Sequence, residues 1–320
     1  MNHLWKLGIG GSLLVILTLP ALASAQLKTV RVASAHKLTT ATLPLFVGMH
    51  MKFFEEVGLK IEPSYFLGGG DTIRAVTSRS ADITHNAAPG ATLIAISKGE
   101  PLKIVAGNTG PAGTLWVVPT DSPIKSIKDL KGKKVGFSTP GSVTHVAIQQ
   151  ILKKEGLDKD VQLVRAGGPG DNWAAIKNKV IDAGWNVGPG VYNLIVKNEA
   201  RVLIYTAHYV KEYQETVIIA TEEMINKDPE MIRNYLKARA KAINFLWENQ
   251  EKAIAIWTEE VKLPPDVLRL ALKDTPRNYW DTGAPKPENL RAAIQEVLDI
   301  GAIKEPLDPA KVQDLRFVPK

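Results

Sequence analysis

A run of hydroxyl-bearing and small residues at Ser138, Thr139, Gly141 and Ser142 combines groups that can hold a small anion or another polar solute. The run follows a β-like segment and precedes an amphipathic stretch at 143–154, so it lies at the amino end of a predicted helix. Such helix ends present unpaired N–H groups, to which anions bind readily. Simple helix capping by Thr139 or Ser142 explains the same residues without a ligand. We favour ligand contact because several donors cluster there.

A second set of hydroxyls, including Thr39 and Thr40, precedes a predicted helix that begins at Leu43. We expect one threonine of this segment to cap the helix and the others to donate hydrogen bonds to a ligand. Gly69 belongs to a run of three glycines at 68–70, which permits close approach of the backbone to a ligand. No Lys follows this run in the GKS or GKT manner and no GxGxxG is present, which excludes a phosphate-binding loop.

Four further polar or aromatic residues lie at or just after the ends of β-like segments: His85, Asn86, Asn108 and Trp185. In an open α/β sheet the loops beyond the carboxyl ends of the strands converge on a crevice, so we include all four among the candidate ligand contacts. A structural role for His85 and a core position for Trp185 remain open at this point. An indole at such a position can stack on a ligand or donate through its N–H.

Motifs for catalysis and metal binding are absent from the sequence. It contains no GxSxG element for a nucleophilic serine and no HExxH or similar histidine spacing. We therefore predict no catalytic residues, no cofactor and no metal. The histidines considered for a metal site were His36, His50, His85, His145 and His208.

The elements that must position these residues alternate between short β-like runs and amphipathic helical stretches, the pattern of an α/β protein. A helix is predicted at 43–57, where apolar residues recur at three- and four-residue spacing before Gly58. Beyond residue 222 the sequence is nearly all helical, with helices expected at 251–261, 265–273 and 287–298. The predicted strands are 30–35, 60–66, 82–85, 103–106, 134–138, 161–165 and 183–185.

An internal echo with an offset of one hundred residues suggests two lobes of similar plan. In each copy a Gly-rich loop leads into a short helix and then into a strand that begins near an acidic residue. Gly70, Asp71, Ala75 and Asp82 recur as Gly170, Asp171, Ala175 and Asp182.

The amino terminus indicates export. Residues 1–25 contain Lys6, an apolar run at 7–19 and the small residues Ala23 and Ala25, which together predict a secretory signal peptide cleaved before Gln26. The apolar run is shorter than the roughly 20 residues of a membrane-spanning helix. The chain has no cysteine, so neither a disulfide nor a lipid-bearing cysteine is expected.

The formal net charge of +7 is compatible with nucleic acid, an anionic membrane or an acidic ligand as partner. The predicted export excludes nucleic acid, and the lysines are scattered without a block of five or six, as on a solvated surface. A weak preference for an anionic ligand remains.

The segment 121–142, DSPIKSIKDLKGKKVGFSTPGS, resembles the start of the second lobe in periplasmic binding proteins of the sulfonate, nitrate and taurine type, a group that includes binders of thiamine-precursor pyrimidines. Three upstream segments follow the same order: LPLFVGMHMKFFEEVGLKIE, GGGDTIRAVTSRSADI and ISKGEPLKIVAG. The resemblance extends to about residue 246. Agreement of several separate segments is more specific than any single Gly-rich loop.

This resemblance implies an α/β protein with the type II periplasmic-binding-protein fold, in which two lobes are joined by two hinge strands and the C-terminal part is helical. We place the hinge strands at 114–119 and 216–221, lobe one at 27–115 and 218–320, and lobe two at 116–217. The resemblance also implies ligand binding at the 138–142 loop.

The function implied is that of the periplasmic solute-binding component of an ABC importer. It would capture a small, anionic solute such as a sulfonate, nitrate or carboxylate, act as a monomer and deliver the solute to a permease and an ATPase. Two alternatives use the same fold: an enzyme related to pyrimidine-precursor synthesis and a sensor that presents its ligand to a receptor. The enzyme relatives carry a cysteine-rich motif, which this chain lacks.

Overall fold

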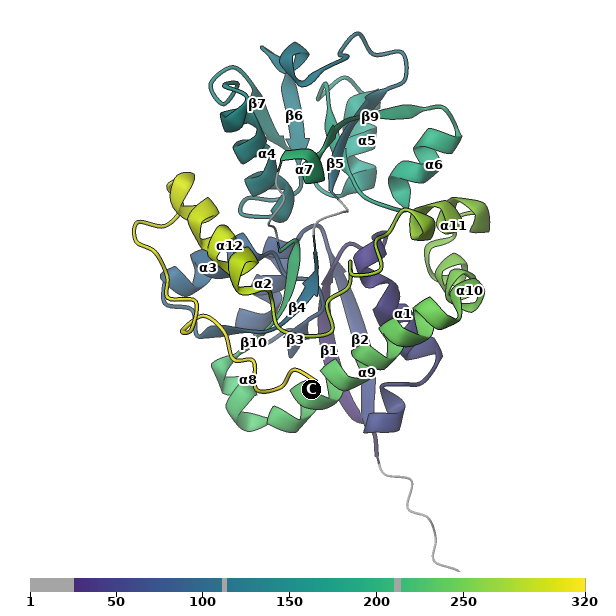
Figure 1. Ribbon diagram of the computed structural model, residues 1–320, viewed down its shortest axis with the longest axis vertical. Coiled ribbons are helices and arrows are strands. Elements are labelled where there is room, and N and C mark those ends of the chain that lie inside the picture. The colour runs from purple at the N-terminus through teal and green to yellow at the C-terminus, as the bar shows by residue number, and fades with distance from the viewer. Residues whose placement is uncertain (1–25, 111–113, 210–213, 320) are drawn as a thin grey trace, which may run out of the picture.

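The computed structural model describes residues 26–110, 114–209 and 214–319. The predicted signal peptide at 1–25 lies outside these residues. The chain forms two α/β lobes, one above the other in Figure 1, and its C-terminal helices lie along the lower one. Within the described residues, no helix has both the length and the apolar character needed to cross a membrane.

Lobe one contains two small sheets that lie side by side. One has the order β2-β1-β3 with all strands parallel, and in the other β10 runs antiparallel to β4. The two are linked where Ile219 N–H donates to Thr84 Oγ1 at 2.9 Å and where Ala87 forms a bridge with Val217. The strands are β1 (Lys28–Ala35), β2 (Leu59–Phe66), β3 (Ile83–Thr84), β4 (Leu102–Thr109) and β10 (Thr216–Thr221).

Lobe two repeats this plan with a three-stranded sheet of order β8-β5-β9 and a parallel pair β6-β7. A parallel bridge between Val135 and Ala183 connects the two sheets. The strands are β5 (Leu115–Pro119), β6 (Lys134–Phe137), β7 (Gln162–Arg165), β8 (Gly184–Asn186) and β9 (Ala200–Tyr205).

The placement of the hinge strands at 114–119 and 216–221 is corrected by the sheet pairing. β5 pairs with β8 and β9 of lobe two, and β10 pairs with β4 of lobe one, so each strand belongs to one sheet. Both strands are largely buried, and their backbone groups must find partners in a sheet rather than span the gap between lobes. The predicted lobe boundaries therefore fall inside β5 and β10.

The helices fill the connections between strands and cover the sheets. Those of the first half are η1 (Thr40–Thr42), α1 (Leu43–His50), η2 (Glu55–Val57), α2 (Gly69–Thr77), α3 (Pro89–Ser97), η3 (Ile127–Leu130) and α4 (Val143–Lys154). Those of the second half are α5 (Pro169–Lys177), α6 (Gly190–Val196), α7 (Thr206–Tyr209), α8 (Glu222–Lys227), α9 (Pro229–Glu248), α10 (Gln250–Val261), α11 (Pro265–Lys273) and α12 (Pro287–Asp299).

The helix predicted at 43–57 ends early, at His50. The chain turns at Lys52, whose φ of 59° lies in the left-handed region, and the buried Phe54 ring packs onto Gly48. A Cβ at Gly48 would lie 2.5 Å from that ring. The sequence keeps its helix-like apolar spacing beyond His50 because Phe53 and Phe54 are also buried in the core, although they lie in a turn and not in a helix.

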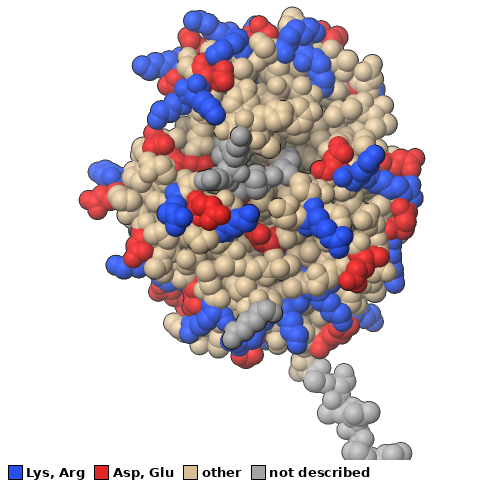
Figure 2. Space-filling model, in the orientation of Figure 1, with Lys and Arg blue, Asp and Glu red and all other residues tan. Residues whose placement is uncertain are grey.

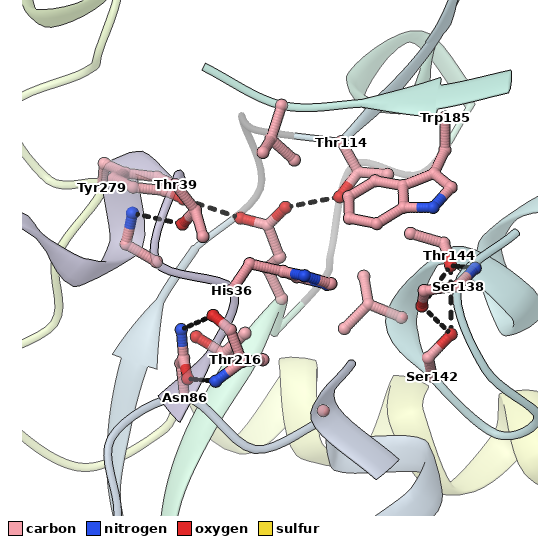
Figure 3. Close-up of a pocket in the computed structure, with 16 residues that line it drawn as sticks. His36, Thr39, Asn86, Thr114, Ser138, Ser142, Thr144, Trp185, Thr216 and Tyr279 are labelled. Atoms are coloured by element: carbon pink, nitrogen blue, oxygen red, sulfur yellow. Dashed lines mark hydrogen bonds between the residues drawn. The ribbon is translucent and has the colours of Figure 1, made fainter. Parts of the chain in front are cut away.

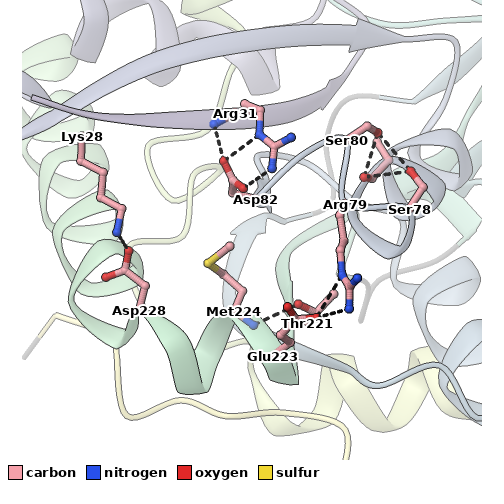
Figure 4. A network of polar contacts seen from close by, with 11 residues as sticks. Lys28, Arg31, Ser78, Arg79, Ser80, Asp82, Thr221, Glu223, Met224 and Asp228 are labelled. Carbon is pink, nitrogen blue, oxygen red and sulfur yellow. Dashed lines mark hydrogen bonds and ion pairs between the residues drawn. The ribbon is translucent and has the colours of Figure 1, made fainter.

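The internal echo corresponds to a real structural repeat. α2 and α5 begin one hundred residues apart. An aspartate just before the strand that follows each helix accepts a hydrogen bond from a backbone N–H of a neighbouring strand. Asp82 accepts a hydrogen bond from Arg31 N–H at 2.8 Å, and Asp182 accepts one from Lys134 N–H at the same distance. In lobe one the Arg31 guanidinium also contacts Asp82, which lowers the pKa of that carboxyl (Figure 4).

The largest core lies in lobe one, beneath α9. Tyr235, Ile243, Leu246 and Trp257 are all buried there. The aromatic residues of the C-terminal helices therefore form core, as their helical spacing predicts.

Candidate functional site: a cleft between the lobes

A cavity that is partly open to solvent lies between the two lobes and is lined by residues from both (Figure 3). Its lining residues follow strands or begin helices, which is where an open α/β sheet places a binding crevice. They are Ala35, His36, Thr39, Ala41, Gly69, Asn86, Thr114, Ser138, Ser142, Val143, Thr144, Trp185, Val187, Glu215, Thr216 and Tyr279.

The lobe-two wall carries a cluster of three hydroxyls at the start of α4, formed by Ser138, Ser142 and Thr144. Ser138 Oγ donates to Ser142 Oγ at 2.8 Å, and Thr144 Oγ1 lies 2.9 Å from Ser138 Oγ and 3.0 Å from Ser142 Oγ. Ser142 Oγ also accepts from His145 N–H at 3.2 Å and caps α4. Ser142 thus both caps the helix and lines the cavity, so the two roles considered for it are compatible.

Trp185 lies at the same side of the cavity, on β8. Its Nε1–H donates to Gly167 O at 3.0 Å, which fixes the orientation of the indole. The ring centroid lies 5.0 Å from that of His36, which comes from lobe one (Figure 3). The two rings form an aromatic wall with one member from each lobe.

His36 was not among the predicted site residues, although it directly follows β1 and satisfies the rule that selected His85. Burial lowers the pKa of His36 to about 4, and nearby Asp171 opposes this effect only in part. The imidazole is therefore neutral at pH 7 and can donate or accept a hydrogen bond, but it supplies no positive charge.

The lobe-one wall contains Thr39, Asn86 and Gly69. Thr39 Oγ1 accepts from Ala41 N–H at 2.9 Å and caps η1, as expected for one threonine of this segment. The Asn86 amide is held by the Ala35 backbone, from which it accepts at 2.5 Å and to which it donates at 3.0 Å. Thr39 and Asn86 lie together on this side of the cavity (Figure 3).

Glu215 is a second residue that the sequence analysis missed. It lies just before β10 and is 5% exposed. Its Oε1 accepts from Thr114 Oγ1 at 2.7 Å, and its Oε2 accepts from Tyr279 Oη at 3.0 Å. Burial raises the pKa of this carboxyl, and the hydroxyl donors partly offset that effect. No motif marks Glu215, because its three-way contact joins residues that are far apart in the sequence.

His85 does not line the cavity, so its predicted place in the crevice is wrong. β3 ends at Thr84 and the fully buried imidazole turns into the core. Its Nε2 lies 3.1 Å from Ala41 O and its Nδ1 lies 2.8 Å from Tyr235 Oη. Because a carbonyl oxygen only accepts, Nε2 carries the proton and Nδ1 accepts from the tyrosine. Burial lowers the pKa of His85 to about 3, so it is neutral.

Asn108 is also absent from the cavity wall, contrary to the prediction. Its side chain is buried, donates to Thr216 Oγ1 at 2.8 Å and accepts from the Arg239 guanidinium at 2.5 Å. The strand extends to Thr109, further than predicted, and this keeps Asn108 inside the sheet. Asn108 thus accepts a hydrogen bond from the buried Arg239 instead of facing the cavity.

Thr40, Thr139 and Gly141 were also predicted as ligand contacts, and all three lie at contacts between the lobes instead of in the cavity wall. Thr40 N–H donates to Gly188 O of lobe two at 2.8 Å. A Cβ built on Gly68 of lobe one would lie 2.7 Å from Thr139 Oγ1, and one built on Gly141 would lie 3.4 Å from Ala91. These close approaches show that the lobes are in contact around the cavity.

The distribution of charge limits what the cavity can bind. Among the described residues no Lys or Arg lines it, although Lys and Arg are interspersed with Asp and Glu over the face shown in Figure 2. Within the same residues no group of three or more His, Asp or Glu is placed to hold a metal ion. The site offers hydroxyls, backbone groups, an indole and one carboxyl.

Comparison with known proteins identifies one family model and several relatives that are named as binding proteins. The family model described as NMT1/THI5 like matches residues 39–253. YtlA of Bacillus subtilis (strain 168), named as a candidate binding protein, is 25% identical over 291 residues, which is 85% of this chain and 84% of that protein. A similarly named protein of Brucella abortus (strain 2308) is 24% identical over 274 residues, 80% of this chain and 81% of the other.

Solved structures share the fold. The alkanesulfonate-binding protein SsuA from Xanthomonas axonopodis pv. citri, bound to MOPS, has a TM-score of 0.74 and 21% identity, covering 92% of this chain and 96% of its own. The periplasmic nitrate-binding protein NrtA from Synechocystis PCC 6803 has a TM-score of 0.69 and 18% identity, covering 87% and 83%. The predicted periplasmic-binding-protein fold is thereby confirmed.

Proposed function

The chain belongs to the NMT1/THI5-like family, and we propose that it is the extracytoplasmic solute-binding component of an ABC importer. The observation that carries this proposal is the cavity between the lobes, whose polar groups come from both lobes and are buried together. Neighbours named as alkanesulfonate-binding and nitrate-binding proteins support the same role.

The hydroxyl cluster at the start of α4 is the proposed place for an anionic or other acceptor group of the solute. Ser138, Ser142 and Thr144 supply hydroxyl groups there, beside the amino end of a twelve-residue helix. One helix end contributes ~0.3–1 kcal/mol to holding an anion, whereas micromolar capture needs about 8 kcal/mol. Both lobes must therefore contribute contacts and exclude water, which makes closure of the lobes part of binding.

Binding without chemical change follows from this proposal. The polar groups of the cavity contain no nucleophile with a base and an orienting group in hydrogen-bond reach, as far as the described residues extend. A solute incubated with the protein should be recovered unchanged. Conversion of the solute would favour the alternative of an enzyme on this fold.

Export to the periplasm and docking to a permease and ATPase complete the proposal. Mass spectrometry of periplasmic protein should find Gln26 as its first residue. Membrane-bound protein that retains Met1 would contradict cleavage. Solute uptake that stops when the gene is deleted, with the permease intact, would separate transport from a sensor role.

The direct test is a thermal-shift screen over sulfonates, nitrate, carboxylates, aromatic acids and pyrimidines. A ligand that binds only the folded state stabilises it by RT ln(1 + [L]/Kd), about 2.7 kcal/mol at one hundred times Kd. At least one class should raise the melting temperature in a concentration-dependent manner. The absence of any shift across all classes at millimolar concentration would count against solute binding.

A further inference from the structure

We propose that two buried titratable residues of opposite charge type, Glu296 and His36, balance the closure of the lobes against pH, so that the closed fraction changes little between about pH 5.5 and 8. Both residues belong to lobe one, and both contact lobe two in the closed molecule. This inference rests on the closure that the proposed function requires, and it adds a feature of the fold that keeps closure independent of pH.

Glu296 lies where α12 of lobe one meets α4 of lobe two (Figure 1). Its side chain is buried and is hydrogen-bonded to that of Gln150 on α4. One turn further along both helices, Lys153 Nζ donates to Asp299 O at 3.2 Å. Since Gln150 and Lys153 both belong to lobe two, this contact exists only when the lobes are together. Opening the cleft removes the lobe-two atoms that cover the Glu296 carboxyl.

The surroundings of Glu296 favour the protonated carboxyl. Burial raises its pKa from 4.5 to about 7, the acidic Asp299 adds to this effect, and the hydrogen bond from the neutral Gln150 opposes it. α3, which also packs on α12, carries no titratable side chain. The titratable residues of α4 are at its two ends and make other hydrogen bonds: His145, Lys153 and Lys154. Ionisation of Glu296 in the closed molecule is therefore costly.

His36 is the opposite case. Its ring lies against that of Trp185 of lobe two, and a Cβ built on Gly168 of lobe two would lie 3.4 Å from its Nδ1. Burial lowers the pKa of His36 from 6.5 to about 4, and Asp171, also of lobe two, opposes this effect only in part. The closed molecule therefore holds the imidazole neutral at a pH at which an imidazole in water is protonated.

The two residues act on closure with opposite signs. When the lobes separate, each side chain regains water and its ordinary pKa, which is 4.5 for Glu296 and 6.5 for His36. Ionisation of Glu296 then favours the open form more and more as the pH rises from 4.5 towards 7. Protonation of His36 favours the open form more and more as the pH falls from 6.5 towards 4. Because these ranges overlap, a change in pH that strengthens one effect weakens the other.

The two effects are also similar in size. The pKa of Glu296 rises from 4.5 to about 7 on closure, and that of His36 falls from 6.5 to about 4. Proton linkage then predicts that the ratio of closed to open molecules changes by only about threefold between about pH 5.5 and 8 when both residues are present. With His36 alone this ratio rises roughly tenfold over the same range, and with Glu296 alone it falls by at least roughly tenfold.

Single-molecule energy transfer between dyes on the two lobes tests this inference without any solute. The chain contains no cysteine, so Lys159→Cys on lobe two and Glu248→Cys on lobe one, both at exposed positions, accept a dye pair. In this labelled parent the ratio of closed to open molecules should change by about threefold or less between about pH 5.5 and 8. It should rise roughly tenfold in Glu296→Gln and fall roughly tenfold or more in His36→Asn.

The matched controls are Glu288→Gln, at an exposed position of α12, and His50→Asn, at an exposed position of α1. Both should behave as the labelled parent does. A protein with both Glu296→Gln and His36→Asn should again be nearly independent of pH. Glu215 and Tyr279, the other titratable residues in the cavity wall, are the same in every variant, so the difference between a variant and the parent isolates the substituted residue.

Denaturation curves at both pH values establish that each variant is folded, and if one is not, the slope of the other decides the question. The same pH dependence in the folded variants as in the parent would overturn this inference, as would a change of more than about tenfold in the parent. A negative thermal-shift screen would instead refute solute binding, because the energy-transfer measurement uses no solute.

Discussion

The His36 ring of lobe one lies against the Trp185 ring of lobe two, with their centroids 5.0 Å apart and their planes inclined by 53°. The two rings are tilted relative to one another rather than stacked face to face, and their centroid separation lies in the range of favourable aromatic pairs. Because its members come from different lobes, this contact exists only when the lobes are close together. Opening or closing of the cleft therefore changes the environment of the Trp185 indole.

Trp185 should therefore report ligand binding. Among the described tryptophans it alone lines the cavity. We expect solute binding to change the tryptophan fluorescence, and we expect Trp185→Phe to remove most of that change. The substitution also removes the hydrogen bond to Gly167 O, which should lower the free energy of unfolding by about 0.5–1.5 kcal/mol. Trp257→Phe, in the core of lobe one, should retain the signal, and a persistent signal in Trp185→Phe would contradict this assignment.

Ser142→Ala should lower both affinity and stability. As a cap of α4, Ser142 contributes about 0.5–2 kcal/mol to the free energy of unfolding. As a lining residue it should also cost about 1–3 kcal/mol in binding, because a polar ligand group would be left unpaired in a dry cleft. Calorimetric titration and a denaturant curve measure the two effects separately.

Ser126→Ala is the control for this experiment. Ser126 belongs to a capping box at the start of η3 in the same lobe, outside the cavity. Its replacement should reduce stability and leave affinity unchanged. If Ser142→Ala behaved in the same way, Ser142 would be a cap only.

Gly68→Ala should hinder closure of the lobes. A Cβ at this position would lie 2.7 Å from Thr139 Oγ1 and 3.1 Å from Ser138 Oγ of the opposite lobe, so these side chains or the lobes themselves must shift. We expect weaker solute binding with little loss of stability, because the clash arises only between the lobes. Gly170→Ala is the control, since a Cβ there meets no atom within 4 Å. Small-angle scattering with solute should show a wider molecule for Gly68→Ala, and identical curves for the two variants would refute the steric argument.

Glu296 should make stability fall as pH rises. It lies on α12 of lobe one, is 7% exposed and is hydrogen-bonded to Gln150 on α4 of lobe two. Burial raises its pKa from 4.5 to about 7. Between these values the folded protein holds a proton that the unfolded chain has lost, so the free energy of unfolding decreases with rising pH across this window, on the order of 3 kcal/mol in total.

Glu296→Gln should remove this dependence, because the amide stays neutral at every pH. Denaturation at pH 5 and at pH 8 measures the difference, and Glu288→Gln, at an exposed position of the same helix, serves as control. Equal pH dependence in Glu296→Gln and in the unmodified protein would show that ionisation of Glu296 does not reduce the free energy of unfolding, and would contradict this prediction.

The sequence by itself determined the α/β class, most strand positions, the repeat between lobes and the hydroxyl-rich start of α4. These features are local, because periodicity, turn residues and capping residues act over a few positions along the chain. Helix α4 was predicted with its observed limits, and Ser138 and Ser142 were predicted at the cavity that they line. Trp185, Thr39, Asn86 and Gly69, also predicted as ligand contacts, line the same cavity, and their contact with a ligand stays a prediction.

Only the tertiary structure decided which strand-end residues face the cleft. His36 and His85 follow neighbouring parallel strands, yet the first turns toward Trp185 and the second turns under α9 to meet Tyr235. Packing of a helix more than one hundred residues downstream makes that choice, and no local pattern encodes it. Glu215 is the clearest case, since Thr114 and Tyr279 reach it from distant parts of the chain, and the chemistry of the site depends on where that carboxyl is buried.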